Sequence, residues 1–96
     1  MSAFSFPGSQ LVTASAAIGI AGKPKIIYAI HIISAGTLSV ATIKNNGSGG
    51  TTYIAESGTA NKGVTFTYGL GMFFPTDAYF TADGNLTSAL VSYSEV

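Results

Sequence analysis

The sequence predicts an all-β protein: an antiparallel β-sandwich or a partly open, jelly-roll-like barrel with a flexible N-terminal arm. Apolar and polar residues alternate with a period of two in several segments, and the 3.6-residue period of a helix is missing. Turn-forming segments separate these runs at intervals of about 8–14 residues, which is typical of sandwiches. The connections are too short for helical crossovers, so antiparallel pairing is favoured. The 96 residues form one domain, because so short a chain cannot close a second core.

The first clear strand is predicted at residues 25–33, "KIIYAIHII". Simple alternation puts Ile26, Tyr28, Ile30 and Ile32 on one face. The other face, which includes His31, is itself half apolar. A strand with two partly apolar faces is covered on both sides, so we expect this one to lie near the middle of a sheet.

The next predicted strands are "TLSVATIK" at 37–44 and "TTYIAES" at 51–57. The loop between them, "NNGSGG", contains an Asn-Gly pair, which accepts the positive φ angles of hairpin turns. After the turn-forming segment at 57–63, "VTFTY" at 64–68 shows the clearest alternation in the chain. Its Val, Phe and Tyr side chains point to one face and its two threonines to the other.

The last third of the chain holds an aromatic segment and a closing strand. "MFFP" at 72–75 and "AYFTA" at 78–82 are separated at Pro75, and a proline within a ladder indicates an edge or a bend. The "GLG" and "DGN" tripeptides that follow residues 68 and 82 are interpreted as turns. "LTSALVSY" at 86–93 completes the set of strands.

Residues 1–22 differ from the rest of the chain, so we divide it into an N-terminal arm, 1–22, and a β-sandwich domain, 23–96. The arm is rich in alanine, serine and glycine and has few large side chains. Its composition favours a flexible segment or one weak strand. In an assembly, such an arm could become ordered against a neighbouring subunit.

Charge is scarce along the whole sequence. Charged residues make up 8% of the chain, there are four lysines and no arginine, and the formal net charge is zero. An average soluble domain has about 25% charged residues. A chain with so little charge has a low electrostatic barrier to self-association. The composition therefore favours a protein embedded in an assembly over a free cytosolic enzyme.

The same composition disfavours several other classes. Four scattered lysines cannot form the basic footprint that binds phosphates, so we expect no nucleic-acid partner. No apolar run approaches the roughly 20 residues of a membrane span, so we expect no membrane partner. The N-terminus lacks the basic start and apolar centre of a signal peptide, and we do not expect classical secretion. No cysteine is present to form a disulfide or a thiolate metal site.

His31 is the only histidine and the first candidate for chemistry. A catalytic or metal-binding histidine needs a second group to orient it and a nucleophile or metal within reach. The chain offers no cysteine, no second histidine, four carboxylates and no Gly-x-Ser-x-Gly elbow. A metal shared across a symmetry axis stays open as an alternative, but we interpret His31 as a hydrogen-bonded strand residue. We predict no enzyme activity and no catalytic, cofactor-binding or metal-binding residues.

Two further groups of residues are candidates for ligand binding. Asp83-Gly84-Asn85 offers two oxygen-bearing side chains, whereas calcium needs six to eight oxygen ligands, so a plain turn is favoured. Aromatic residues such as Tyr53 and Tyr79 could form a platform for stacking sugars. Tryptophan would be favoured in that role and is absent, so core and cross-strand packing is the preferred interpretation.

Several features recur together in one known group of proteins. A strand ending in Ile-Ser-Ala-Gly leads to a Val/Ile-rich strand and an Asn-Gly turn. A Gly-x-x-Phe strand, a Phe-Pro passage and a closing Val-Ser-Tyr strand follow. Over about residues 23–94 this order resembles small β-sandwich structural proteins of tailed-bacteriophage virions. The pattern contains no catalytic motif.

The resemblance implies a non-enzymatic component of the virion, most specifically a capsid decoration (cement) protein that stabilises the shell through subunit interfaces. Such a protein needs no cofactor. Its partners would be itself, as a homotrimer or another symmetric oligomer, and other virion proteins such as the major capsid protein. The alternative is a tail, neck or fibre component with a receptor- or glycan-binding β-sandwich head. That alternative would use exposed aromatic residues, with Tyr53 and Tyr79 as the candidates.

Overall fold

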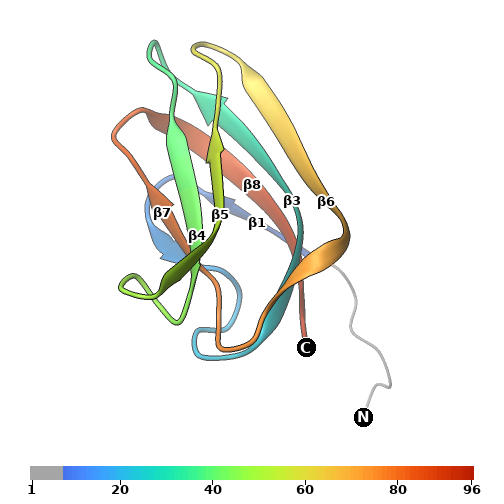
Figure 1. The fold of residues 1–96 in the computed structure, drawn as a ribbon. Helices are drawn as coiled ribbons and strands as arrows, with labels where there is room; N and C mark the ends of the chain where they lie inside the picture. Colours follow the sequence, from blue (N-terminus) through green and yellow to red (C-terminus); the bar gives the residue numbers. More distant parts are fainter. Residues whose placement is uncertain (1–7) are drawn as a thin grey trace.

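The protein is an eight-stranded β-sandwich in the computed structural model, which describes residues 8–96 (Figure 1). Every strand pairing is antiparallel, which confirms the predicted fold class. In chain order the strands are β1 Gly8–Val12, β2 Ala16–Ala17, β3 Lys25–Ser34, β4 Val40–Asn45, β5 Thr51–Ser57, β6 Gly63–Phe74, β7 Tyr79–Ala82 and β8 Leu86–Glu95.

The strands form two four-stranded sheets. Sheet A has the order β1-β8-β3-β6 and sheet B the order β2-β7-β4-β5. Apart from the β4–β5 hairpin, consecutive strands belong to different sheets, so the chain crosses repeatedly from one sheet to the other. This strand order is the arrangement of a jelly roll. As expected, β3 lies inside its sheet, between β8 and β6.

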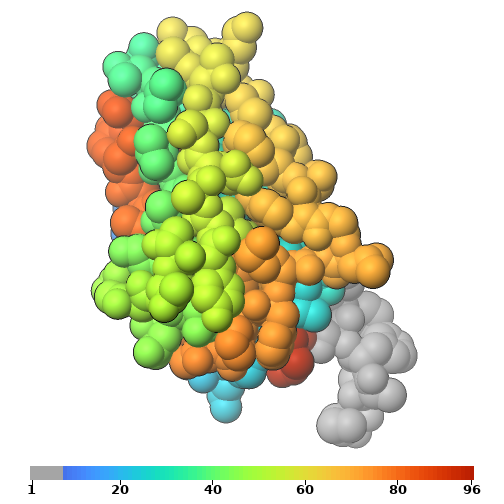
Figure 2. Space-filling model, in the orientation of Figure 1, coloured from blue at the N-terminus to red at the C-terminus, as the bar shows by residue number. Residues whose placement is uncertain are grey.

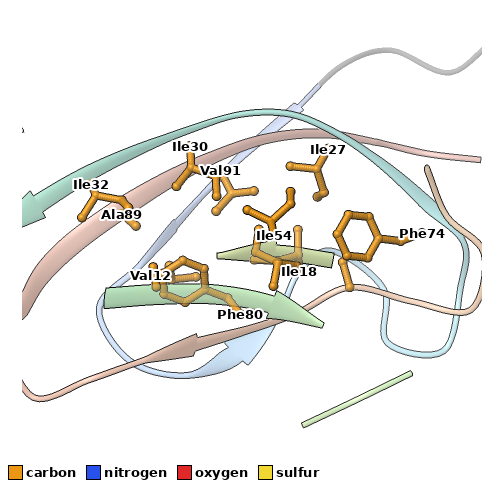
Figure 3. Close-up of a cluster of buried hydrophobic side chains, with 13 residues drawn as sticks. Val12, Ile18, Ile27, Ile30, Ile32, Ile54, Phe74, Phe80, Ala89 and Val91 are labelled. Carbon is orange, nitrogen blue, oxygen red and sulfur yellow. The ribbon is translucent and has the colours of Figure 1, made fainter. Parts of the chain in front are cut away.

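The core lies between the two sheets, where apolar side chains from each sheet meet (Figure 3). Isoleucines of β3 and Val91 of β8 face Ile54 of β5 and Phe80 of β7. The buried apolar set is Val12, Ile18, Ile27, Ile30, Ile32, Ala41, Ile43, Ile54, Phe74, Ala78, Phe80, Ala89 and Val91. Two phenylalanines and many β-branched residues therefore fill the interior, as the preference for core packing of aromatics predicts for Phe74 and Phe80.

A β-bulge in β3 overturns the simple alternation predicted for residues 25–33. The register of β3 against both β6 and β8 shifts between Ile27 and Ala29. Ile27 and Ile30 are consequently both fully buried, although an odd-numbered and an even-numbered residue of a regular strand would face opposite sides. Ile26 lies on the opposite side of the sheet from Ile30. Tyr28 is the extra residue of the bulge, so the side chains of residues 25–27 point to the faces opposite to those that simple alternation predicts.

A second bulge joins residues 64–68 and 72–74 into one strand, although the sequence analysis predicts a turn between them. β6 runs from Gly63 to Phe74, so the Gly-Leu-Gly tripeptide lies inside a strand and is not a turn between strands. Gly69 and Gly71 have φ angles of 60° and 107°, which glycine adopts at little steric cost. The tripeptide forms a bulge opposite Tyr28, and the ladder resumes at Met72.

Residues 8–22, which the sequence analysis assigns to the N-terminal arm, are part of the sandwich. β1 pairs with β8 at the edge of sheet A, and β2 pairs with β7 at the edge of sheet B. Val12 and Ile18 contribute buried side chains to the core. Residues 1–7 of the predicted arm lie outside the described residues.

The β4–β5 hairpin has the predicted turn chemistry. Asn46 and Gly47 have φ angles of 76° and 78°, which confirms the interpretation of the Asn-Gly pair. The Asp77 carboxylate accepts hydrogen bonds from the backbone N–H groups of both residues. In return, Asn45 Oδ1 accepts hydrogen bonds from the N–H groups of Thr76 and Asp77. These contacts fix the hairpin loop against the loop between β6 and β7.

Candidate interaction surface

Each of the four carboxylates in the chain holds part of the fold together. At one end of the sandwich, Lys25 is fully buried, and its ammonium donates hydrogen bonds to the carbonyls of Ile20 and Lys23. Glu95 Oε1 lies 3.5 Å from Lys25 Nζ, while its Oε2 accepts the N–H of Ile20 over 2.8 Å. This ion pair anchors the loop between β2 and β3 to the end of β8.

Glu56 binds a tyrosine across the gap between the sheets. Tyr68 Oη donates a hydrogen bond of 2.9 Å to Glu56 Oε2. Burial, the hydrogen bond to the carboxylate and the negative charge of Glu56, in that order, raise the pKa of Tyr68 far above its ordinary value. The phenol therefore stays protonated and donates its hydrogen bond to the Glu56 carboxylate.

Asp83 organises the turn before β8. Its carboxylate accepts hydrogen bonds from the N–H groups of Val40 and Asn85 and from the hydroxyl of Ser39. The bond from Val40 is the largest contribution that lowers the pKa of Asp83, and partial desolvation opposes it. Both carboxylate oxygens serve the turn, in agreement with the turn interpretation of Asp83-Gly84-Asn85.

His31 lies on a strand beside a hydroxyl group. Its Nδ1 is 2.7 Å from Thr65 Oγ1, directly across the β3–β6 ladder. Gly63 leaves room for the ring, because a Cβ at this glycine would lie 2.7 Å from His31 Nε2. Within residues 8–96, no three histidine, aspartate or glutamate side chains are grouped so that they could hold a metal ion, and no pocket opens on the surface.

The two tyrosines considered for sugar binding lie in sheet B, on strands that flank β4. Tyr53 is 39% exposed, and its ring centroid lies 5.0 Å from that of Phe74 at an interplanar angle of 37°. Tyr79 is half-buried and pairs with Lys44 and Ala17. The two tyrosines thus lie on strands that β4 separates.

The most distinctive surface is the outer face of sheet A, on the side of the sheet away from the core. One row of directly paired residues crosses all four strands: Leu11, Leu90, His31 and Thr65. Neighbouring rows contribute alanine, serine, threonine, glycine and one isoleucine. We call this surface the sheet A face and define it as Ser9, Leu11, Ala29, His31, Ile33, Gly63, Thr65, Thr67, Ser88, Leu90 and Ser92.

The sheet A face carries no lysine, aspartate or glutamate. Leu11 is 64% exposed and Leu90 is 41% exposed, so two large apolar side chains stand next to each other on it. On the opposite face of the sandwich, Lys44 lies among the outward residues of sheet B. The remaining charged residues lie in loops, at strand ends or on the side of β5 that faces Tyr68. The face is thus uncharged and partly apolar, although it is accessible to solvent.

Sequence reasoning did not find this surface. Leu11 falls in the segment assigned to the arm, and the bulge at Tyr28 hides which side of β3 carries His31. The available signal was the combination of uncharged alternate residues in "GSQLV" and "LTSALVSY", which pair with each other only in the folded chain.

A separate exposed apolar residue marks the edge of sheet A. Leu70, at the tip of the β6 bulge, is 99% exposed. The same part of β6 forms the projection at the side of the molecule in Figure 2. Gly71 fits closely there, since a Cβ would approach the side chains of Ile26 and Tyr28. The bulge interrupts the free edge of β6, which protects such an edge from pairing with other chains.

Among the described residues, no helix has the length and apolar character needed to cross a membrane. Comparison with known proteins finds no family model, no curated protein and no solved structure that matches this chain.

Proposed function

We propose that this chain is a non-enzymatic structural protein that works as a subunit of a larger assembly. The observation that carries the proposal is the sheet A face, which is uncharged and exposes leucine side chains. Charged residues are depleted from the cores of protein interfaces, and a solvent-facing sheet normally carries more of them. The carboxylates and the one histidine are engaged in internal hydrogen bonds, which leaves surface contact as the function best supported.

The assembly that we propose is the virion of a tailed bacteriophage, with this chain as a capsid decoration (cement) protein. The resemblance over residues 23–94 supports this class. A jelly roll is found in viral capsid proteins and in lectins alike, so the fold is compatible with the class without selecting it. In this proposal the partners are further copies of the chain and the major capsid protein, and neither nucleic acid nor membrane takes part.

The mechanism would be the addition of buried interface around a shell. Burial of apolar surface contributes roughly 25 cal/mol per Å², so each contact adds a modest favourable free energy. Association also costs translational and rotational freedom, which limits the net gain from a single small contact. Many identical subunits on one shell would sum their contributions. Such a protein needs exposed faces of good complementarity and no reactive centre.

The test is reassembly on particles. The purified chain is added to shells of the phage that encodes it, prepared without this protein, and the mixture is sedimented and imaged by electron microscopy. We expect co-sedimentation with a fixed number of copies per shell and a higher temperature of shell disruption. A soluble protein with no affinity for these shells would contradict the proposal.

A second candidate is a glycan- or receptor-binding head of a tail or fibre, and the partial exposure of Tyr53 supports it. Tyr53 is accessible on one side, where a sugar ring could stack. A glycan array probed with the wild-type chain and with Tyr53→Ala tests the idea, with Tyr79→Ala as a second variant. Signal that disappears in Tyr53→Ala would favour the glycan-binding head, and an array without signal would remove it.

A further inference from the structure

We propose that the sheet A face binds a second copy of this chain, with the two sheets stacked face to face across a two-fold axis. The inference rests on the proposed function as an assembly subunit and names the partner of one surface. Four properties of the face support this occupant: its charge, its relief, its area and the position of its leucines.

The sheet A face has no charged residue that would repel a second copy of the same face. When two copies of the same surface meet, every charge faces the same kind of charge or must be paired with an opposite one elsewhere on the face. The sheet A face has no lysine or carboxylate, so a self-contact brings no like charges together and desolvates no permanent ion. A partner with a charged surface would gain nothing from this face.

The shape of the sheet A face is suitable for packing against another β-sheet. Around the leucines, most residues are small: Ser9, Ala29, Ser88 and Ser92. Stacked sheets approach to about 10 Å, which requires short side chains or interdigitation. A helix or a loop would fit a grooved surface better than this one. A flat partner is available in the same face of another copy.

The area sets the strength of the contact. The whole outward side of sheet A, to which this face belongs, has strands of 5, 10, 10 and 12 residues. With about 3.3 Å per residue and about 4.8 Å between strands, it gives a flat area of at most roughly 600 Å². Stable interfaces bury about 800 Å² per partner, with a lower range near 600 Å². We therefore expect a reversible dimer that forms at concentrations on the order of 10–100 µM. An obligate dimer would need more surface.

The position of the leucines determines the orientation. Leu11 and Leu90 occupy the β1–β8 half of the central row, and His31 and Thr65 the β3–β6 half. A two-fold axis that runs across the strands places β8 over β8 and brings the leucines of both copies together. An axis along the strands would place the leucines over the polar half instead. Apolar burial thus favours the first arrangement, in which Leu90 lies near its own equivalent.

Single-cysteine variants test this arrangement, because the chain has no cysteine of its own. Leu90→Cys is compared with Val40→Cys, which lies on the outward side of sheet B with a matched exposure of 43% against 41%. With a short thiol-specific bifunctional cross-linker, which can span the roughly 10 Å between stacked sheets, and at about 100 µM protein, in the range where the dimer should form, we expect Leu90→Cys to give a covalently linked dimer and Val40→Cys to remain largely monomeric. Equal cross-linking of both variants, or cross-linking of Val40→Cys alone, would overturn the proposal.

Sedimentation equilibrium provides an independent measurement of the same contact. We expect a monomer–dimer equilibrium for the wild-type chain and for Val40→Lys. Leu90→Lys should raise the dissociation constant about tenfold or more, since its ammonium would be buried without a partner. Circular dichroism and thermal unfolding establish that both lysine variants are folded. A wild-type chain that is monomeric throughout this range, or that forms a trimer, would overturn the proposal.

The outcome also separates this inference from the proposed function. A monomeric chain that still binds shells would remove the two-fold contact and leave the structural role in place. A dimer through Leu90 that has no affinity for shells would support the contact and contradict the role in the virion.

Discussion

Tyr68 Oη donates a hydrogen bond to Glu56 Oε2 over 2.9 Å, and this contact joins β6 of sheet A to β5 of sheet B. Both strands are edge strands on the same side of the sandwich. On the other side, Gln10 of β1 donates from Nε2 to the carbonyl of Ala17 in β2 over 3.0 Å, and its Oε1 accepts the N–H of Gly19 over 2.7 Å. Polar side chains therefore bridge the two sheets at both lateral openings, Tyr68 with Glu56 on one side and Gln10 on the other.

The Tyr68–Glu56 contact predicts a loss of stability in alkali. Because the folded-state pKa of Tyr68 is raised, its contribution is complete below the unfolded-state pKa of about 10 and is lost as the pH rises above it. Tyr68→Phe should cost about 1 kcal/mol at pH 7, a figure reduced for the partial exposure of the pair. Between pH 9 and about 11, where tyrosine ionises, the wild-type chain should lose more stability than the variant.

Urea unfolding followed by circular dichroism at each pH measures this difference. Tyr53→Phe is the matched control, because Tyr53 is partly exposed and lacks a carboxylate partner among its hydrogen bonds. A Tyr68→Phe variant with the same alkaline slope as the wild-type chain would show that Tyr68 does not govern this dependence.

The Lys25–Glu95 ion pair predicts an asymmetry between its two partners. Lys25 is fully buried, whereas the Glu95 side chain is 32% exposed. Glu95→Ala leaves a buried ammonium without its counter-charge and should cost about 2–3 kcal/mol. Lys25→Met keeps the length of the side chain and leaves a partly exposed Glu95, whose Oε1 is buried but whose Oε2 still accepts the N–H of Ile20, so it should cost about 1 kcal/mol.

Thermal and chemical unfolding of both variants would show the order of these effects. A double variant, Lys25→Met with Glu95→Gln, should recover part of the loss, because no uncompensated charge remains. If Lys25→Met proved the more damaging single change, the hydrogen bonds to the carbonyls of Ile20 and Lys23 would outweigh the charge pair.

We expect the same substitution, glycine to alanine, to reduce the stability of the fold by different amounts at the two glycines of the β6 bulge. Gly71→Ala places a Cβ against Ile26 Cγ2 and the Tyr28 ring at a φ of 107°, and we expect a loss of about 2–4 kcal/mol. Gly69→Ala meets open space at a φ of 60°, so only backbone strain of about 1–2 kcal/mol opposes it. Equilibrium unfolding compares the two directly, and equal losses would argue against close packing at Gly71.

Because Gly63 and His31 lie close together, we expect the effects of substituting them on stability to be non-additive. A Cβ at Gly63 would lie 2.7 Å from His31 Nε2 and 2.8 Å from its Cε1, so Gly63→Ala must displace the ring from Thr65. His31→Ala alone should cost no more than about 1 kcal/mol, the value of one partly exposed hydrogen bond. In the His31→Ala background, Gly63→Ala should be nearly neutral or stabilising, because the obstacle is gone.

A double-mutant cycle in urea measures this coupling. Independent effects of the two substitutions would mean that the ring does not rest against Gly63.

The sequence was sufficient for the fold class and for most strands, because alternation and turn residues are local signals. Asn46-Gly47 illustrates this, since the turn needs only the two residues that form it. The bulge at Tyr28 could not be predicted, because it depends on how β6 and β8 pair with β3. The turn predicted at Gly69–Gly71 is a bulge within β6 for the same reason. Both errors concern register, which is set by partners far away in the sequence.

The sheet A face was beyond sequence reasoning because it is assembled from four strands in an order unrelated to the chain. Leu11 and Leu90 are at opposite ends of the sequence, yet they are paired neighbours. His31 attracted attention as a possible reactive group, and the structure instead places it beside Thr65 in the row that contains these leucines. The interpretation of His31 as a hydrogen-bonded strand residue agrees with this position, whereas the surface to which it belongs is visible only in three dimensions.

The placement of β8 between β1 and β3 has a consequence for biosynthesis. Until residues 86–95 have emerged from the ribosome, β1 has no partner in sheet A and β3 has only one. A nascent chain that lacks this segment leaves one edge of β3 unpaired, and an unpaired edge with exposed apolar side chains is prone to aggregation. Completion of sheet A must therefore wait until β8 has been synthesised.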